Sequence, residues 1–305
     1  MGLVRCRGAV FAAVIGHAVC SGGCAATLAG APPESIAMRE SATSTVIGTR
    51  TLELHLASPP RSGGQQMPLV VYASGDGGWF GSAVGMFRTI ARSGFPTIGF
   101  STRALMNIEH ARSRPLTIAS IVAAYQRIVD GGRRALGLPD DTPIILTGWS
   151  RGASLGVLVA HRDRLDPRLL GVVAVGLPAD ERLGVESGSD DSGDEDSSRQ
   201  ANLNPAHARS LDTYPLLADM APLRCAVIQA SHDGYLPAAR ARQLFGPDLD
   251  TRKLVTIEAR NHRFDGGELA FTNALRDSII WVAAEVRAGR PPMVQPMDST
   301  ATQGR

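Results

Sequence analysis

Apolar residues along the chain alternate between short continuous runs and helical periods. The runs, each bounded by turn residues, occupy residues 67–73, 143–147, 170–177, 226–230 and 254–258, and a further strand is expected at 97–103. Runs without polar alternation are typical of strands covered on both faces. Between them, apolar residues recur every three or four positions, which predicts helices at about 82–92, 116–136, 153–160 and 268–287. The pattern predicts an α/β domain with a mostly parallel sheet and helices on both faces.

Outside these runs the pattern changes. Residues 51–56 alternate polar and apolar, as in a half-buried edge strand, and residues 32–50, rich in Pro, Ser, Thr and Ala, indicate a linker. Acidic residues without apolar neighbours fill 185–200. Their spacing is not that of a calcium-binding EF-hand loop, so a solvated, disordered insertion is the better interpretation. We therefore expect one domain over 51–290 with this insertion, followed by a disordered tail at 291–305.

The N-terminal segment has the pattern of a secretory signal. Within residues 1–31, Arg5 and Arg7 precede an apolar run at 8–16 and then small residues. The run is too short to span a membrane, which takes about 20 apolar residues. The segment predicts a periplasmic or secreted protein, with a lipid anchor only if cleavage occurs before Cys24. A buried N-terminal helix is the alternative.

Charge and cysteine content exclude several classes of protein. Without residues 1–31, basic and acidic residues balance at 29 each, so a broad electrostatic footprint for nucleic acid is not supported. Three of the four cysteines lie in that segment, which leaves Cys225, together with Cys24 if cleavage occurs before it, and no disulfide framework. The sequence calls for no cofactor and no metal site, and the oligomeric state stays open.

The motif Gly148-Trp149-Ser150-Arg151-Gly152 lies between an expected strand and an expected helix. A G-x-S-x-G in this context is the nucleophile elbow, in which a sharp turn lifts the serine hydroxyl clear of the sheet. The flanking glycines lack the Cβ that would collide with the strand or the helix. Because the chain has 33 glycines, an ordinary strand-to-helix turn is the alternative when the motif is taken alone.

Ser150, Asp233 and His262 each follow a different expected strand, in the chain order nucleophile, acid, histidine. This order is that of an α/β-hydrolase. A histidine that titrates near neutrality can take the serine proton, and an aspartate can fix its tautomer and stabilise the imidazolium. His232 is a rival base whose side chain should point away from Asp233, and Asp265 is a rival acid that is close in sequence to His262. The sequence thus predicts a catalytic triad.

The glycine-rich turn after residues 67–73 is a candidate oxyanion hole. Here a backbone N–H from Asp76 or Gly77 would join the N–H of Arg151, because such a donor must approach the substrate oxygen unobstructed. A phosphate-binding loop is the alternative, but the Lys-Ser/Thr ending of a P-loop is missing. Arg103 is expected at the rim of the sheet, either as a phosphate ligand or as a solvated side chain, and the Asp76 carboxylate could receive an ammonium group.

Four motifs of the chain resemble those of the VirJ-type bacterial virulence protein family, over about residues 67–285. They are Ser74-Gly75-Asp76-Gly77-Gly78-Trp79, Ser101-Thr102-Arg103, Gly148-Trp149-Ser150-Arg151-Gly152-Ala153 and Asn261-His262-Arg263-Phe264-Asp265-Gly266. The resemblance implies an exported, periplasmic α/β-hydrolase linked to virulence and to hydrolysis of aminoacylated phosphatidylglycerol, with Ser150 matching the nucleophile and His262 the histidine. The chain departs from the family at Trp149, commonly Tyr, at Ser154, commonly Asp, and in its acidic insertion, which bears on the substrate.

Taken together, these patterns predict a serine ester hydrolase that acts through an acyl-enzyme. Trp79 and Trp149 are expected to form an aromatic wall beside Ser150, which suits a small-molecule or lipid ester and contact with a membrane surface. A non-catalytic periplasmic binding or chaperone protein that keeps the fold, and a general carboxylesterase or lipase, are the alternatives.

Overall fold

The computed structural model describes residues 38–59, 67–110, 116–163, 166–183 and 209–287. By contacts the chain divides into a unit at 1–35, outside the described residues, and a unit at 36–305 that contains all of them. The segments expected to be a signal peptide with Cys24, an acidic insertion and a disordered tail also lie outside the described residues.

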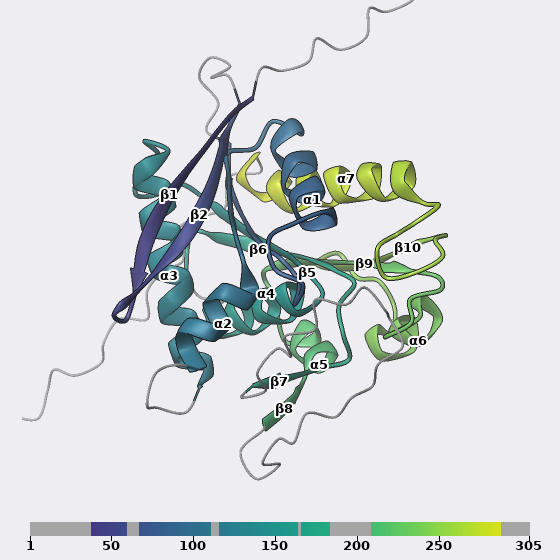
Figure 1. The fold of residues 1–305 in the computed structure, drawn as a ribbon. Coiled ribbons are helices and arrows are strands. Elements are labelled where there is room, and N and C mark those ends of the chain that lie inside the picture. Colours follow the sequence, from purple (N-terminus) through teal and green to yellow (C-terminus); the bar gives the residue numbers. More distant parts are fainter. Residues whose placement is uncertain (1–37, 60–66, 111–115, 164–165, 184–208, 288–305) are drawn as a thin grey trace, which may run out of the picture. The chain divides into compact units, whose positions relative to one another are not determined.

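An eight-stranded sheet forms the centre of the second unit, in the order β1-β2-β4-β3-β5-β6-β9-β10 (Figure 1). Its strands are β1 Arg39–Ile47, β2 Arg50–Ser58, β3 Leu69–Ala73, β4 Thr97–Phe100, β5 Ile144–Trp149, β6 Leu169–Val175, β9 Arg224–Ala230 and β10 Arg252–Ile257. The pairings from β4 to β10 are parallel, and those of β1 with β2 and of β2 with β4 are antiparallel. Strands β7 Asp180–Leu183 and β8 Arg209–Asp212 form a separate antiparallel pair. The predicted mostly parallel sheet is confirmed.

Helices cover both faces of this sheet. Figure 1 shows α1 Ser82–Arg92 and α7 Glu268–Arg287 on one side and α2 Thr102–His110, α3 Ile118–Ala135 and α4 Arg151–Arg162 on the other. The apolar cluster on the second side also receives side chains from α5 Thr213–Ala218 and α6 Ala238–Phe245. In β3, Leu69 and Val71 belong to one cluster, whereas Val70 and Tyr72 belong to the other. Burial on both faces explains why this strand has no polar alternation.

Three expectations about the first half of the chain are wrong. Residues 39–47 form β1 and not a linker, because they pair along their whole length with β2 through a turn at Gly48, whose φ is 63°. The strand expected at 51–56, now β2, is therefore not at the edge of the sheet. The strand expected at 97–103 ends at Phe100, so that Arg103 lies in the first turn of α2.

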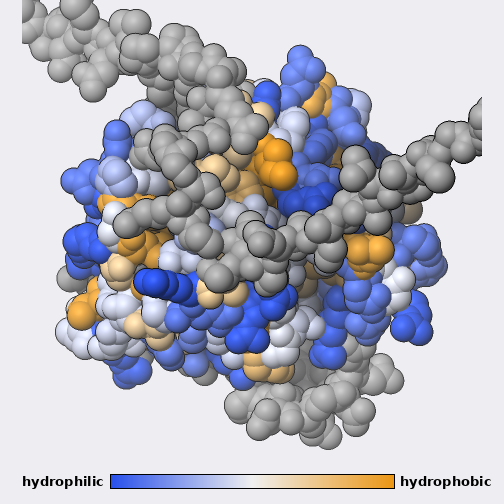
Figure 2. Space-filling model, turned by 90° about the horizontal axis from the view of Figure 1, so that it is seen from above, coloured by the Kyte–Doolittle hydropathy of each residue, from blue (hydrophilic) through white to orange (hydrophobic). Residues whose placement is uncertain are grey.

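The surface of the described residues carries few large apolar side chains. Figure 2 shows one face of the molecule, on which hydrophobic residues lie in small separate groups among hydrophilic ones. Phe80 and Tyr235 are the most exposed aromatic side chains among the described residues, at 67% and 78%. In this part of the chain no helix combines the length and the apolar character that crossing a membrane requires.

Candidate active site

Ser150 occupies a strained turn between β5 and α4. Its φ is 55° and its ψ is −122°, a conformation that non-glycine residues rarely adopt. A Cβ on Gly148 would lie 2.3 Å from the carbonyl carbon and oxygen of Gly152, and a Cβ on Gly152 would lie 2.3 Å from the carbonyl oxygens of Ala73 and Ser74. The two glycines of the motif are thus required by the close approach of α4 to β5 and β3, which is the geometry of a nucleophile elbow.

Asp233 and His262 meet at the ends of β9 and β10. The Asp233 carboxylate is 1% exposed, and its Oδ2 lies 2.6 Å from His262 Nδ1. Oδ1 accepts hydrogen bonds from the backbone N–H groups of Tyr235 and Leu236, and Oδ2 accepts one from Gln229 Nε2 at 3.0 Å. A carboxylate held in this way fixes the ring so that Nδ1 donates and Nε2 is the basic nitrogen.

The imidazole of His262 lies over the end of β6, next to the elbow. A Cβ on Gly176 would be only 2.6 Å from His262 Cε1, and the preceding carbonyl, that of Val175, accepts a hydrogen bond from Ser150 N–H at 2.9 Å. Trp149 donates from Nε1 to the His262 carbonyl at 3.2 Å and stacks on its ring at a centroid distance of 5.5 Å. These contacts tie the histidine to the strand end that carries Ser150.

His262 Nε2 is buried and has no hydrogen-bond partner within the part of the chain that the structure describes. Among these described residues, His262 Nε2 is therefore not hydrogen-bonded to Ser150 Oγ. Contacts between nucleophile and base are often long in free enzymes and shorten when substrate binds. The arrangement therefore has the acid and the base in contact and leaves the basic nitrogen available for a proton.

The glycine-rich turn after β3 packs directly against Ser150. A Cβ on Gly75 would touch Ser150 Cβ at 3.4 Å, and the next residue, Asp76, has its carbonyl held by Arg103 Nε at 2.7 Å. Arg151 is the first residue of α4, where N–H groups point away from the helix and have no acceptor within it. The glycine-rich turn and the first residue of α4 thus both lie next to Ser150, which is where the donors of an oxyanion hole would be needed.

The side chain of Arg151 forms a buried ionic cluster that the sequence did not indicate. Its Nε donates to Glu181 Oε1 at 2.9 Å, its Nη1 lies 3.4 Å from Asp76 Oδ1, and its Nη2 donates to the Arg182 carbonyl at 3.0 Å. Glu181 is 4% exposed, and this burial raises its pKa to about 7 even though the Arg151 guanidinium acts in the opposite direction. The Asp76 carboxylate, expected to receive an ammonium group, is thus already paired with a cation.

Three other residues singled out in the sequence make their contacts outside the triad. The Trp79 indole stacks on His55 at 4.1 Å and packs against Gly99 and Phe87, between the sheet and α1, and not as a wall beside Ser150. His232 contacts Ser231 and Ala259 at the surface. Asp265 accepts a hydrogen bond from Asn261 Nδ2 at 2.8 Å. Neither rival residue takes part in the pair formed by Asp233 and His262.

Sequence reasoning missed four residues that shape the site. They are Gly176 beneath the His262 ring, Gln229 beside Asp233, Glu181 behind Arg151 and Tyr235, whose ring meets that of His262 edge-on at 4.9 Å. Gln229 could have been found as a polar residue within the apolar run of its strand. Glu181 had no such signal, because it lies in a short strand pair that no pattern predicted.

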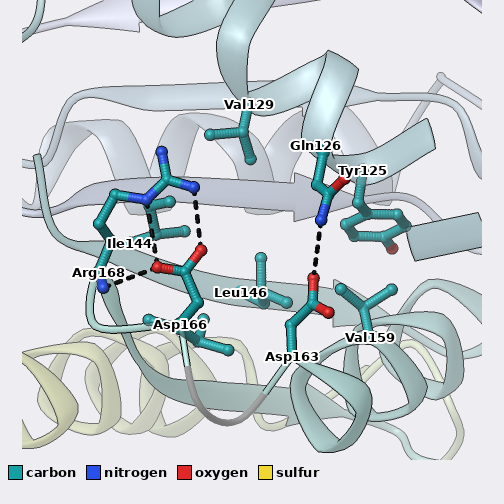
Figure 3. A pocket seen from close by; sticks show the side chains of 10 residues that line it. Tyr125, Gln126, Val129, Ile144, Leu146, Val159, Asp163, Asp166 and Arg168 are labelled. Atoms are coloured by element: carbon teal, nitrogen blue, oxygen red, sulfur yellow. Dashed lines mark hydrogen bonds and ion pairs between the residues drawn. The ribbon is translucent and has the colours of Figure 1, made fainter. Parts of the chain in front are cut away.

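A small cavity at the other end of the sheet does not belong to this site (Figure 3). It lies where β5 and β6 begin, whereas Ser150 follows the end of β5. Its volume of about 30 Å³ suits a water molecule rather than a substrate. It is lined by Tyr125, Gln126, Val129, Ile144, Leu146, Val159, Asp163, Asp166, Arg168 and Leu169. Among the described residues, no group of histidine, cysteine and acidic side chains could hold a metal ion.

Comparison with known proteins finds similarity in structure only. No family model matches the sequence, and no curated protein does. Est1E from Butyrivibrio proteoclasticus has a TM-score of 0.51 at 16% identity, covering 80% of this chain and 99% of its own; another structure of Est1E has ferulic acid bound. The esterase domain of a Rhodothermus marinus protein has a TM-score of 0.50 at 11% identity, with 82% and 98% covered. For 2,6-dihydroxy-pseudo-oxynicotine hydrolase the TM-score is 0.55 at 17% identity, and the match covers 82% of this chain and 69% of that protein.

At these identities the likeness establishes the fold and not the activity. The strand order, the elbow and the placement of helices on both faces agree with it. The described part of the chain has the α/β-hydrolase fold, as the sequence predicted.

Proposed function

We propose that the protein is a serine ester hydrolase, with Ser150 as nucleophile, His262 as general base and Asp233 as the acid that orients it. The observation that carries the proposal is the buried Asp233 carboxylate 2.6 Å from His262 Nδ1, beside a serine in an elbow turn. Polar groups buried in this way are seldom arranged without a chemical use, since an unpartnered ring nitrogen such as Nε2 lowers stability.

The chemistry follows from the placement of these groups. Ser150 Oγ attacks the ester carbonyl carbon while His262 Nε2 takes the hydroxyl proton, and the carbonyl oxygen becomes an anion facing the backbone donors of Asp76 or Gly77 and of Arg151. Collapse of this intermediate expels the alcohol, which receives the proton from His262. Water then attacks the acyl-enzyme by the same route and releases the acid and free Ser150.

A fluorophosphonate probe tests the proposal directly. We expect the folded protein to be labelled at Ser150, and Ser150→Ala to lose both labelling and hydrolysis of p-nitrophenyl butyrate, because loss of the nucleophile in such a triad lowers turnover by a factor on the order of a million. Mass spectrometry of the labelled peptide identifies the residue.

Two results would reject the enzyme. Folded protein that is not labelled, or Ser150→Ala that is labelled as fast as the parent, would favour the alternative of a non-catalytic binding or chaperone protein with a hydrolase fold. Circular dichroism of both proteins ensures that the comparison is made between folded chains.

For the substrate we propose an ester with an apolar or aromatic portion, aminoacylated phosphatidylglycerol being the candidate suggested by the resemblance to the VirJ-type family. Phe80, which lies next to Gly77 of the glycine-rich turn, and Tyr235, whose ring contacts that of His262, are both exposed aromatic residues. Such side chains offer apolar contact to an acyl or alcohol group. Because Asp76 is paired with Arg151, recognition of a cationic aminoacyl group would require part of this pair to be exchanged.

A substrate panel separates the classes. We expect vesicles containing lysyl-phosphatidylglycerol to release lysine with a higher kcat/KM than that for methyl ferulate or p-nitrophenyl butyrate, measured with enzyme titrated by fluorophosphonate. The opposite order would leave a general carboxylesterase, and activity on vesicles of triacylglycerol alone would indicate a lipase.

A further inference from the structure

The two sides of the candidate oxyanion hole are joined by side chains. Asp76 belongs to the turn after β3, and Arg151 begins α4, so their backbone donors come from separate segments of the chain. The Arg151 guanidinium spans this gap, with Nη1 3.4 Å from Asp76 Oδ1. The same guanidinium is held from behind by Glu181 Oε1 at 2.9 Å and by the Arg182 carbonyl at 3.0 Å.

Burial restricts this connection at the end formed by Arg151 and Glu181. The side chains of Arg151 and Glu181 are 8% and 5% exposed, whereas that of Asp76 is 56% exposed. A planar guanidinium with one edge fixed by a buried carboxylate and a carbonyl has little freedom to rotate. The exposed turn at Asp76 is therefore tied to a buried anchor, and Arg103 Nε donates a second hydrogen bond to the turn at the Asp76 carbonyl.

We propose that Glu181 is a positioning residue for ester hydrolysis: through Arg151 it fixes the turn at Asp76 against the start of α4, and so sets the separation of the two oxyanion-hole donors. This inference rests on the proposed function. Catalysis is sensitive to such separations, because hydrogen bonds to an oxyanion act over distances of about 2.7–3.1 Å. No substitution at Arg151 or Asp76 removes a backbone N–H unless proline is introduced, so side-chain variants leave both backbone donors in the chain.

The test compares Glu181→Gln, Arg151→Met and Asp76→Asn with the parent enzyme above pH 7, where Glu181 carries its charge. We expect each to lower kcat for p-nitrophenyl butyrate by about tenfold or more, below the loss of on the order of 100-fold that removal of a whole oxyanion donor causes, with KM changed less than about threefold. Rates are divided by the number of sites that react with fluorophosphonate, so that misfolded protein does not contribute. The affinity for a trifluoromethyl ketone, which forms the tetrahedral adduct, should fall in parallel with kcat/KM.

The double variant Glu181→Gln/Arg151→Met tests whether Glu181 acts through Arg151. We expect its kcat to equal that of Arg151→Met, because the two residues form one unit. Asp180→Asn, on the same strand but with its side chain bonded to Arg182 and Ser210, is the matched control and should keep the parent kcat. If Glu181→Gln does not fold, the result for Asp76→Asn, at an exposed position, tests the inference alone.

Unchanged kcat per titrated site in Glu181→Gln or Asp76→Asn, or additive losses in the double variant, would overturn the inference. A parent protein that fluorophosphonate does not label would instead reject the proposed function, so the two failures are distinguishable.

Discussion

At the scale of single residues, Gly176 places the catalytic histidine of the proposed triad. Its φ of 56° lies in the left-handed region that glycine tolerates, and the space where a Cβ would be is filled by the His262 ring. The imidazole can thus pack against Gly176 at the end of β6. This glycine has a role comparable to those of Gly148 and Gly152, although it lies in no motif.

Gly176→Ala should therefore impair catalysis more than folding. The new methyl group, 2.6 Å from His262 Cε1, must displace the ring or the backbone, and the left-handed conformation adds a cost of about 1–2 kcal/mol. We expect kcat per titrated site to fall by about tenfold or more while the protein stays folded, since small misplacements of a catalytic group can lower rates by about 100-fold.

Gly234→Ala is the control for this variant. Gly234 adjoins Asp233, yet a Cβ there would meet nothing within 4 Å, and its φ is not positive. It should keep the parent kcat. Equal activities of the two variants, measured with p-nitrophenyl butyrate, would show that the Gly176 contact does not position the histidine.

At the scale of elements, the sequence predicted what is buried on two faces. The apolar runs that correspond to β3, β5, β6, β9 and β10 were recognised because a strand covered on both faces is a nearly continuous apolar run, which is unlike a loop. The elbow was found because close packing of helix on strand demands glycine at two fixed positions. Asp233 and His262 followed from their places after such strands.

Exposed strands and contacts between distant residues were not predictable in the same way. The residues of β1 are mostly exposed and rich in Ser and Thr, so composition suggested a linker, although pairing with β2 makes them a strand. Trp79 was assigned to the site by its place in a glycine-rich turn, but Gly99 leaves a space in β4 that its indole fills. The contact of Glu181 with Arg151 joins residues 30 positions apart, and no local pattern encodes such a pair.

At the scale of the whole molecule, Glu181 links the candidate site to the stability of the fold. It faces Arg151 and Ser154 of α4, Asp76 of the turn after β3 and Tyr125 of α3. Burial raises its pKa from an ordinary value near 4.5 to about 7. Between these two pH values the Glu181 carboxyl keeps its proton in the folded chain and releases it in the unfolded chain, so the contribution of Glu181 to the free energy of unfolding falls as the pH rises.

We expect this fall to reach about 3 kcal/mol between pH 4.5 and 7, since a tenfold change in proton affinity corresponds to about 1.4 kcal/mol. Urea unfolding of the parent and of Glu181→Gln at several pH values gives the measurement. The difference in stability, parent minus variant, should decrease through this window, because the contributions of the other titrating groups cancel.

A difference that rises with pH would mean that attraction to Arg151 outweighs burial and that the pKa of Glu181 lies below its ordinary value. The expected direction has a consequence for the proposed mechanism. Above pH 7 the charged pair of Glu181 and Arg151 would be complete, while Glu181 contributes less to stability than it does in acid. A buried ion pair kept under those conditions is better explained by the position that it imposes on the turn at Asp76 than by stability, because well-packed apolar side chains of similar volume are often as stabilising as a buried ion pair, or more so.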